Sequence, residues 1–185
     1  WAMEILVFDD LANRSHASDI LVDQTYNREE ADYAKFVSPQ CRLMLGPQYA
    51  PLRSPLWKAR KTALARRGGP LRRIMVAVGA SDPSNFTAVA LDAITQSGLD
   101  VEIDVVRGGG ARCVAAVREQ CRKHPLTARL HVDVSATVLA GLITQADIAI
   151  GSGGISVWER CCLGLPSLLV IAAENQRIII EGLND

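Results

Sequence analysis

The chain has 185 residues, of which 49% are hydrophobic and 22% charged, proportions typical of an ordinary globular protein. Its 20 Lys and Arg residues balance 20 Asp and Glu residues, so the formal net charge is zero. This balance removes any general electrostatic argument for nucleic acid or an acidic membrane as partner. No apolar run approaches the roughly 18 residues of a membrane span, and no obligate protein partner is implied.

The five cysteines, at positions 41, 113, 121, 161 and 162, fit neither a disulfide framework nor a zinc site. We therefore expect reduced thiols in a cytoplasmic protein, and no bound metal. The chain starts at Trp1 and enters a strand-like segment at once. This start predicts that the sequence is a piece of a longer protein.

The first third predicts a partial α/β domain. Residues 3–8 are predicted to form a buried strand, residues 19–23 a second strand and residues 42–47 a third, with helical turns over 29–36. Three strands with so little helix between them make a poor domain alone. Residues 1–54 are therefore interpreted as the latter part of an N-terminal Rossmann-like domain.

Residues 55–70 are predicted to be a linker, with a basic helix over 56–67 that ends at Gly68-Gly69-Pro70. The basic side chains could form an anion or nucleic-acid patch. A solvated connecting helix is the favoured alternative, because the chain as a whole is neutral.

From Leu71 the pattern becomes regular and predicts five successive β–α units, which form a parallel, doubly wound sheet with right-handed crossovers. The predicted strands are 73–78, 101–106, 128–132, 147–150 and 167–171, and the helices are 85–97, 111–123, 135–145, 155–163 and 176–183. Residues 71–185 are thus predicted to be a C-terminal domain. In such sheets ligands bind beyond the carboxyl ends of the strands.

The loop after the fourth of these strands has the pattern of a nucleotide site. The strand is expected to break at Gly151 and a helix to open near Ser156, with Gly153 and Gly154 between them. Glycines permit a tight turn, and a helix N-terminus offers free N–H groups to phosphate. Glu159 could accept hydrogen bonds from ribose hydroxyls. Alternatively, Ser156 and Glu159 form a capping box and bind nothing else.

Three other loops remain open to two interpretations. After residue 78, Asp82 and Pro83 are predicted to start a helix, or Gly79, Ala80, Ser81 and Asn85 bind a ligand. The triple glycine 108–110 cradles a base or only turns the chain. Asn175 caps the last helix, or Asn175 and Gln176 reach a sugar or phosphate. Among the histidines, His16 is the only one near carboxylates, and catalysis by it is not favoured.

Several motifs carry a family resemblance. The run Gly-Ser-Gly-Gly-Ile-Ser-Val-Trp-Glu-Arg-Cys-Cys-Leu-Gly-Leu-Pro over residues 151–166, followed by Glu-Asn-Gln over 174–176, resembles the carboxyl domain of the GT-B superfamily around the MurG glycosyltransferases. Three further sequence segments narrow the resemblance to the PseG family. The members of this family are UDP-2,4-diacetamido-2,4,6-trideoxy-β-L-altropyranose hydrolases of pseudaminic acid biosynthesis. The three segments are Phe-Asp-Asp-Leu-Ala-Asn-Arg-Ser-His over 8–16 with Asp-Ile-Leu-Val-Asp-Gln over 19–24, Cys-Arg-Leu-Met-Leu-Gly-Pro over 41–47, and Gly-Ala-Ser-Asp-Pro-Ser-Asn over 79–85.

The resemblance implies a GT-B-like α/β fold and an enzyme that hydrolyses a UDP-linked amino sugar with inversion at the anomeric carbon. It implies no cofactor and no metal. The Gly79 loop and the Gly151–Gly154 turn would hold the pyrophosphate, Glu159 the ribose, and Asn175 with Gln176 the phosphate and sugar. The implied UDP-binding set is Gly79, Ala80, Ser81, Asn85, Gly151, Ser152, Gly153, Gly154, Ser156, Glu159, Asn175 and Gln176.

The sequence departs from the family at the catalytic residue. The family's catalytic histidine follows the first strand of the amino domain, which would place it before Trp1, and His16 sits in a different motif. No catalytic residue is therefore assigned in this chain, which is expected to bind UDP without hydrolysing the substrate. The alternatives are a MurG-like glycosyltransferase or a non-catalytic module that binds nucleotide sugars.

Overall fold

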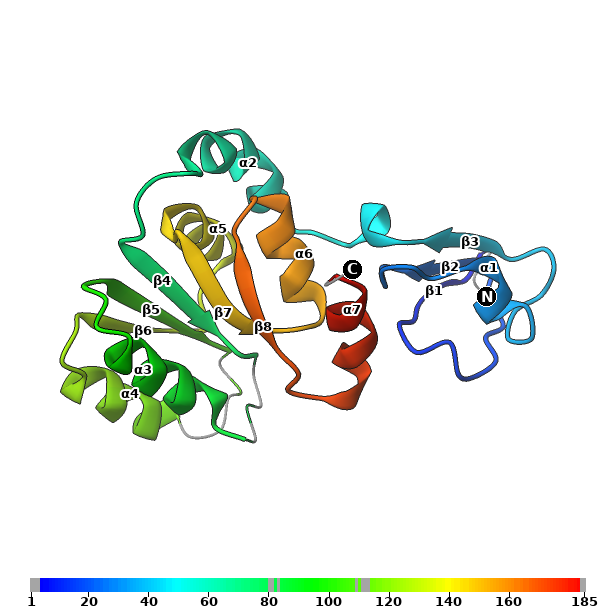
Figure 1. The fold of residues 1–185 in the computed structure, drawn as a ribbon. Helices are drawn as coiled ribbons and strands as arrows, with labels where there is room; N and C mark the ends of the chain where they lie inside the picture. The colour runs from blue at the N-terminus through cyan, green and yellow to red at the C-terminus, as the bar shows by residue number, and fades with distance from the viewer. Residues whose placement is uncertain (1–3, 80–81, 83, 109, 111–113, 184–185) are drawn as a thin grey trace. The chain divides into compact units, whose positions relative to one another are not determined.

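The computed structural model describes residues 4–79, 82, 84–108, 110 and 114–183. The chain divides into two compact units, Trp1–Pro51 with Asn175–Asp185, and Leu52–Glu174. Each unit contains a sheet whose strands are all parallel (Figure 1). The expected α/β class, with one doubly wound sheet and one partial α/β region, is confirmed.

The first unit holds a three-stranded sheet in the order β1-β2-β3. Its elements are β1 (Leu6–Phe8), β2 (Ile20–Asp23), α1 (Glu30–Tyr33), β3 (Arg42–Leu45), the 3-10 turn η1 (Pro47–Tyr49) and α7 (Arg177–Gly182). The third strand ends at Leu45, because Gly46 and Pro47 stop it, as predicted, and begin the 3-10 turn.

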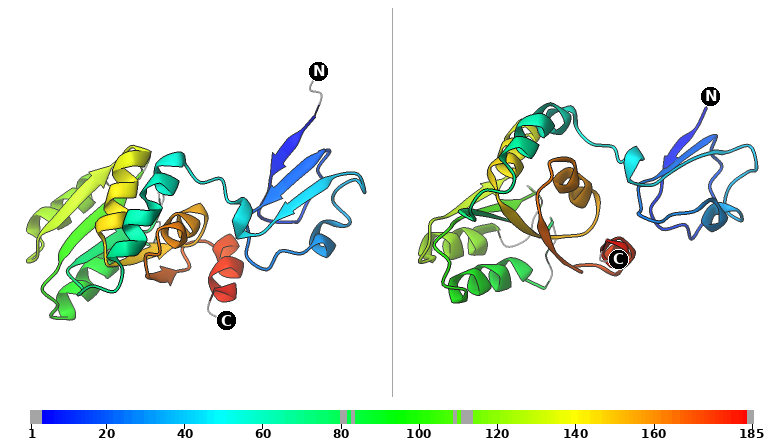
Figure 2. Two further views of the ribbon diagram at one scale, coloured as in Figure 1. Left: turned by 90° about the horizontal axis from the view of Figure 1, so that it is seen from above. Right: turned by 45° about the horizontal axis from the view of Figure 1, so that its top comes forward.

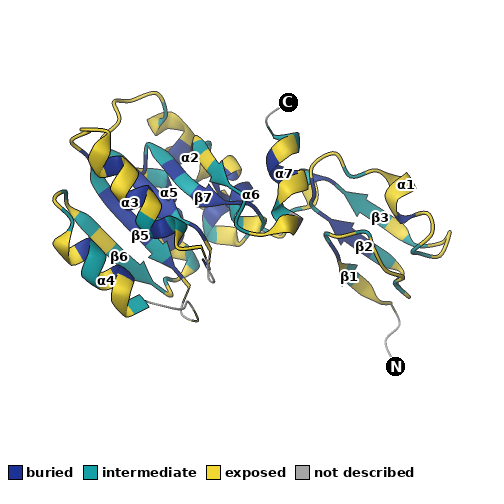
Figure 3. Ribbon diagram, turned by 60° about the horizontal axis from the view of Figure 1, so that its bottom comes forward, coloured by how far each residue is buried: buried dark blue, intermediate teal, exposed yellow. Residues whose placement is uncertain are grey.

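The prediction of a buried strand over residues 3–8 is wrong in length and in burial. The strand starts at Leu6, and the side chains of Leu6 and Phe8 are 50% and 56% exposed. β1 is an edge strand of a small sheet, so few residues surround it. The central strand β2, by contrast, contains the buried residues Leu21, Val22 and Asp23 (Figure 3).

The second unit holds a five-stranded sheet in the order β6-β5-β4-β7-β8. The strands are β4 (Arg73–Ala77), β5 (Glu102–Arg107), β6 (Ala128–Val132), β7 (Ile148–Ser152) and β8 (Ser167–Val170). The helices are α2 (Ser54–Arg66), α3 (Phe86–Gln96), α4 (Val114–Lys123), α5 (Ala136–Gln145) and α6 (Ile155–Cys162). This is the predicted doubly wound arrangement.

The central strand β4 contributes to hydrophobic cores on both faces of this sheet. Ile74 and Val76 pack with buried residues of α3 and α4, whereas Met75 packs with buried residues of α2 and α5. Successive side chains of a strand point to opposite faces, so both faces of β4 must be apolar. The result is three layers, with helices above and below the sheet (Figure 2).

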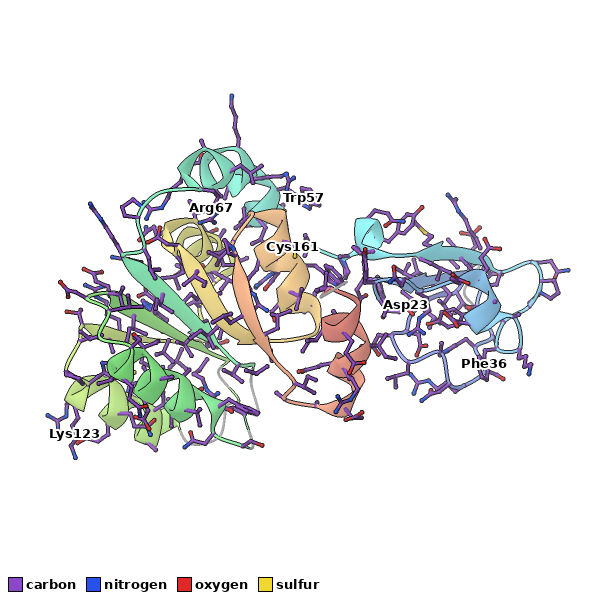
Figure 4. All side chains as sticks on the ribbon, in the orientation of Figure 1. Asp23, Phe36, Trp57, Arg67, Lys123 and Cys161 are labelled. Carbon is purple, nitrogen blue, oxygen red and sulfur yellow. The ribbon has the colours of Figure 1, made fainter. Side chains whose placement is uncertain are left out.

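Helix α2 occupies the segment predicted to be a linker, and it packs against α5 in the second unit. Arg67, which follows α2, donates hydrogen bonds to the carbonyl oxygens of Ile143, Ala146 and Leu163 at 2.5–3.1 Å (Figure 4). Arg60 likewise donates to the Cys162 carbonyl. These two arginines bind carbonyl groups at helix C-termini, where cations are favoured. Arg60 remains exposed as predicted, whereas for the half-buried Arg67 the prediction of a solvated side chain is wrong.

Candidate functional site

The candidate site lies where the strand order of the second unit reverses. From the central strand β4 the chain proceeds to β5 and β6 on one side, and then returns to β7 and β8 on the other. β4 and β7 are neighbours, with Ala77 paired to Gly151. The loops that follow these two strands therefore leave the sheet side by side. In open α/β sheets this topological switch point is the usual place for a ligand.

The turn after β7 starts later than predicted. Gly151 and Ser152 remain in the strand, because Gly151 pairs with Ala77 on one side and with Leu169 on the other. The expected break at Gly151 is therefore wrong, and the turn consists of Gly153 and Gly154. Gly154 is the N-cap of α6 with φ of 89°, a conformation that favours glycine.

Gly151 is needed for close packing. A Cβ atom at this position would lie 2.8 Å from the Ala77 carbonyl oxygen and 2.9 Å from Arg160 Nη1. The carbonyl belongs to the paired strand β4 and Arg160 is buried, so a side chain at position 151 would force one of them to move. This glycine lets β4, β7 and α6 meet at the switch point.

The two glycine turns adjoin each other, as expected. Gly79 follows β4 with φ of +84°, and a Cβ atom there would lie 3.4 Å from Ser152 Oγ. Gly79 is exposed, whereas Ser152 and Gly153 are buried. The predicted binding residues Ala80 and Ser81 lie outside the described residues.

The side chain of Asp82 supports the start of α3, although the helix begins later in the chain than predicted. The helix begins at Phe86, with Asn85 as its N-cap in the left-handed region, and the Asn85 side chain makes no capping hydrogen bond. The buried Asp82 carboxylate accepts hydrogen bonds from the N–H groups of Phe86 and Thr87 at 2.7 and 3.0 Å. It also pairs with buried Arg107 Nη1 at 3.1 Å. The prediction that Asp82 is the N-cap residue is wrong in position, although its carboxylate still satisfies the N–H groups of the first turn.

Glu159 does not form the capping box that was the alternative to ribose binding. Ser156 and Glu159 both lie inside α6, because the N-cap is Gly154, and no side chain caps this helix. Instead Glu159 Oε1 accepts a hydrogen bond from Arg53 Nη2 at 3.0 Å. The Glu159 side chain is only 12% exposed. The capping-box interpretation is therefore wrong.

A cavity of about 160 Å³ brings several of these residues together. Its polar and glycine lining comprises Gly79, Gly108, Ser156, Glu159 and Arg160, and its apolar lining comprises Met75, Ala77, Val106, Leu139 and Ile143. Pockets that enclose a whole drug-sized ligand start at about 300 Å³, so this cavity could enclose only part of such a ligand. Gly108 also lines this cavity, and contact of the triple-glycine loop with a base stays a prediction.

Arg160 and Arg53 were missed by sequence reasoning. Arg160 is only 2% exposed and donates from Nη2 to the Ser152 carbonyl oxygen at 2.8 Å. Burial lowers the pKa of its guanidinium, against the opposing influence of Cys161 and Glu159. The signal in the sequence was its three-residue spacing from Val157, which places it on the buried face of α6. Arg53 offered no comparable signal.

Asn175 and Gln176 belong to the first unit, together with α7. They form the 3-10 turn η2 with Glu174, and the N-cap position of α7 is held by Gln176. The alternative that Asn175 is the N-cap is therefore wrong. Contact of these two residues with a sugar or phosphate stays a prediction.

A second polar cluster lies at the carboxyl ends of β1 and β2 in the first unit. The Tyr33 hydroxyl lies 2.8 Å from both Asp9 Oδ2 and Asp23 Oδ2, and Arg28 Nε lies 2.6 Å from Asp23 Oδ2. His16 Nε2 is 3.5 Å from Asp9 Oδ1. The groups of this cluster mainly satisfy one another, so we interpret it as a network that holds the loops after β1 and β2 (Figure 4, where Asp23 is labelled).

The structure also bears on metals and membranes. Within the described part of the chain, no three His, Cys, Asp or Glu side chains gather as metal ligands would. Cys41, Cys121, Cys161 and Cys162 are free thiols. No helix of the described residues is both long enough and apolar enough to cross a membrane.

Comparison with known proteins shows distant homology. No protein-family model matches the chain. It is similar to the spore coat polysaccharide biosynthesis protein SpsG of Bacillus subtilis (strain 168), with 30% identity over 176 residues that cover 94% of this chain and 50% of SpsG. It is also similar to the uncharacterized protein MJ1062 of Methanocaldococcus jannaschii, with 27% identity over 176 residues, or 93% of this chain and 36% of that protein. The chain therefore spans half or less of each relative.

Proposed function

We propose that the second unit binds UDP at the switch point between β4 and β7. The observation that carries this proposal is the position of Glu159, whose carboxylate lines a small, mainly apolar cavity beside two glycine turns. A carboxylate can accept hydrogen bonds from both hydroxyls of a ribose. The apolar wall and Gly108 suit the flat face of a uracil ring.

The diphosphate would lie over the glycine turns. Gly153, Gly154 and the first residues of α6 present backbone N–H groups at a helix N-terminus, which favours anions. Gly79, together with the predicted residues Ala80, Ser81 and Asn85, would also contact the phosphates. Such donors stabilise negative charge on a departing UDP, and this is what release of UDP from a sugar requires.

For the whole protein we propose an enzyme of sugar biosynthesis. SpsG, to which the chain is similar over nearly all its length, is named for spore coat polysaccharide biosynthesis. The motif resemblance refines this to a cytoplasmic hydrolase that releases UDP from a UDP-linked 2,4-diacetamido-2,4,6-trideoxy hexose with inversion. Asn175 and Gln176 would then contact the phosphate and sugar. The alternatives are a glycosyltransferase and a non-catalytic nucleotide-sugar module, since they would share the same UDP site.

Calorimetric titration with UDP, ADP and GDP tests the proposed binding. We expect UDP to bind, and the purine nucleotides to bind at least about tenfold more weakly, because the small cavity fits one pyrimidine ring. Equal affinity for all three nucleotides, or no binding of UDP, would contradict the proposal. For the whole protein, proton NMR of a reaction with the UDP-linked sugar separates the activities. A hydrolase releases the free sugar without an acceptor, whereas a transferase needs one.

A further inference from the structure

The buried guanidinium of Arg160 is far less paired than its position requires. A guanidinium has five N–H donors, yet the structure gives it one hydrogen bond, from Nη2 to the Ser152 carbonyl oxygen. Nε is buried and has no partner among the described residues. Glu159, its neighbour in sequence, pairs instead with Arg53, and no described carboxylate forms an ion pair with Arg160.

Such an arrangement is unfavourable in the free protein. Transfer of a charge out of water costs free energy unless the charge gains a partner. The lowered pKa of Arg160 has the same physical origin, since burial disfavours the charged form. A group of this kind in an otherwise well-packed unit points to a partner that arrives with a ligand.

The position of Arg160 indicates which ligand group that is. Its Nη1 lies close against Gly151, its Nη2 holds the carbonyl of Ser152, and the side chain lines the same cavity as Gly79 and Glu159. It therefore sits beside the glycine turn at the N-terminus of α6. Charges separated by several ångströms still attract strongly where water is excluded.

We infer that Arg160 is a positioning residue of the diphosphate site, where its hydrogen bond fixes the Ser152 carbonyl and its charge balances that of the bound diphosphate. This inference rests on the proposed function, because it assumes that UDP is the ligand. It assigns the recognition of the diphosphate, rather than of the nucleoside, to a side chain beside the turn. The backbone N–H groups of the turn would contact the phosphate oxygens directly.

Paired titrations with UDP and uridine test the inference, because uridine lacks the diphosphate. Arg160→Met should weaken UDP binding about tenfold or more beyond any change in uridine binding, the range expected for loss of a charge-assisted interaction. The melting temperature of the free Arg160→Met variant should not fall, since replacing a poorly paired buried charge by an apolar group is often neutral or stabilising. Arg66→Met is the matched control. Arg66 is half exposed and pairs with Asp147 at the opposite end of β7, so this variant should bind UDP as the parent does.

The outcomes separate the inference from the proposed function. A parent chain that binds neither UDP nor uridine would contradict the proposed function. An Arg160→Met variant that keeps the parent affinity for UDP, or that loses UDP and uridine binding equally, would contradict the inference alone. If Arg160→Met does not fold, Arg160→Lys and Arg160→Gln decide. The lysine variant should keep most of the preference for UDP over uridine and the glutamine variant should lose it, and an equal preference in both would overturn the inference.

Discussion

Arg53 Nη2 lies 3.0 Å from Glu159 Oε1, which joins the residue before α2 to the second turn of α6. The two residues are 106 positions apart in the sequence. The Arg53 side chain is 48% exposed and that of Glu159 is 12% exposed. Arg53 therefore orients a nearly buried carboxylate from the solvent side. It binds one carboxylate oxygen, Oε1, and does not bind the other.

The first prediction concerns this pair. Glu159→Ala should weaken UDP binding by about 1–3 kcal/mol, because the ribose hydroxyls would lose their acceptor. Arg53→Ala should weaken it by less than about 1 kcal/mol, since a half-exposed ion pair is screened by water. Calorimetric titrations of both variants and of the double variant measure the coupling. An Arg53→Ala variant that loses more affinity than Glu159→Ala would show that Arg53, not Glu159, contacts the nucleotide.

The second prediction concerns the buried pair of Asp82 and Arg107. Asp82→Ala should destabilise the second unit by about 1–3 kcal/mol, because it removes the buried carboxylate that accepts hydrogen bonds from two helix N–H groups and pairs with Arg107. Urea unfolding followed by circular dichroism measures the change. Asp92→Ala, at an exposed position of the same helix, is the control and should change stability by no more than about 0.5 kcal/mol. Equal effects of the two variants would contradict the assigned role of Asp82.

The third prediction compares two glycines of the second unit. Gly151→Ala should destabilise it by about 1–3 kcal/mol, because the new methyl group would meet the Ala77 carbonyl oxygen and Arg160. Gly141→Ala should instead stabilise it by about 0.5–1 kcal/mol, because Gly141 lies within α5 and alanine is the better helix former. A Cβ atom at Gly141 meets nothing within 4 Å. Thermal unfolding of both variants would contradict this account if the two melting temperatures moved in the same direction.

The fourth prediction concerns pH and Asp9. Although burial opposes it, hydrogen bonds from the Ala12 N–H and the Tyr33 hydroxyl, with the nearby His16, hold the pKa of the Asp9 carboxyl below its usual range. A carboxyl with a lowered pKa in the folded state stabilises the fold above the unfolded pKa of about 3.9. That stabilisation is lost as the pH falls through the lower, folded pKa.

Asp9→Asn lacks this titration and tests the fourth prediction. The parent chain should be more stable than the variant at pH 6, and the difference should shrink below about pH 4. Urea unfolding between pH 2.5 and 6 measures both curves. Parallel curves over this range would mean that Asp9 contributes no pH-dependent stability.

The sequence predicted the five-stranded sheet well, because local pattern and tertiary structure agree there. Its strands and helices alternate along the chain at the predicted places, and the helix over 136–145 begins directly after Ser135, whose side chain caps it. The exposed edge strand β1 was less predictable. Its residues are as apolar as those of a buried strand, and burial depends on neighbours that the local sequence does not specify.

At the candidate site, backbone geometry was easier to predict than side-chain contacts. The glycine turns were located from the runs of glycine that follow predicted strands. Gly151, however, is not part of a turn, because it continues the strand through its pairing with Ala77 and permits close packing. Glu159 was identified as a ribose acceptor candidate, but its partner Arg53 lies in a distant segment. Such a long-range contact follows from the packing of α2 near α6, which no local pattern reveals.

A crystal structure of the protein with UDP tests the central claim most directly. We predict ribose hydroxyl oxygens about 2.6–3.2 Å from the Glu159 carboxylate, with the uracil in the adjoining cavity and the phosphates over Gly153 and Gly154. UDP bound in another place, such as the groove of about 450 Å³ between α3 and α4, would contradict the claim. A bound UDP that leaves Glu159 without any contact to the ribose would contradict it equally.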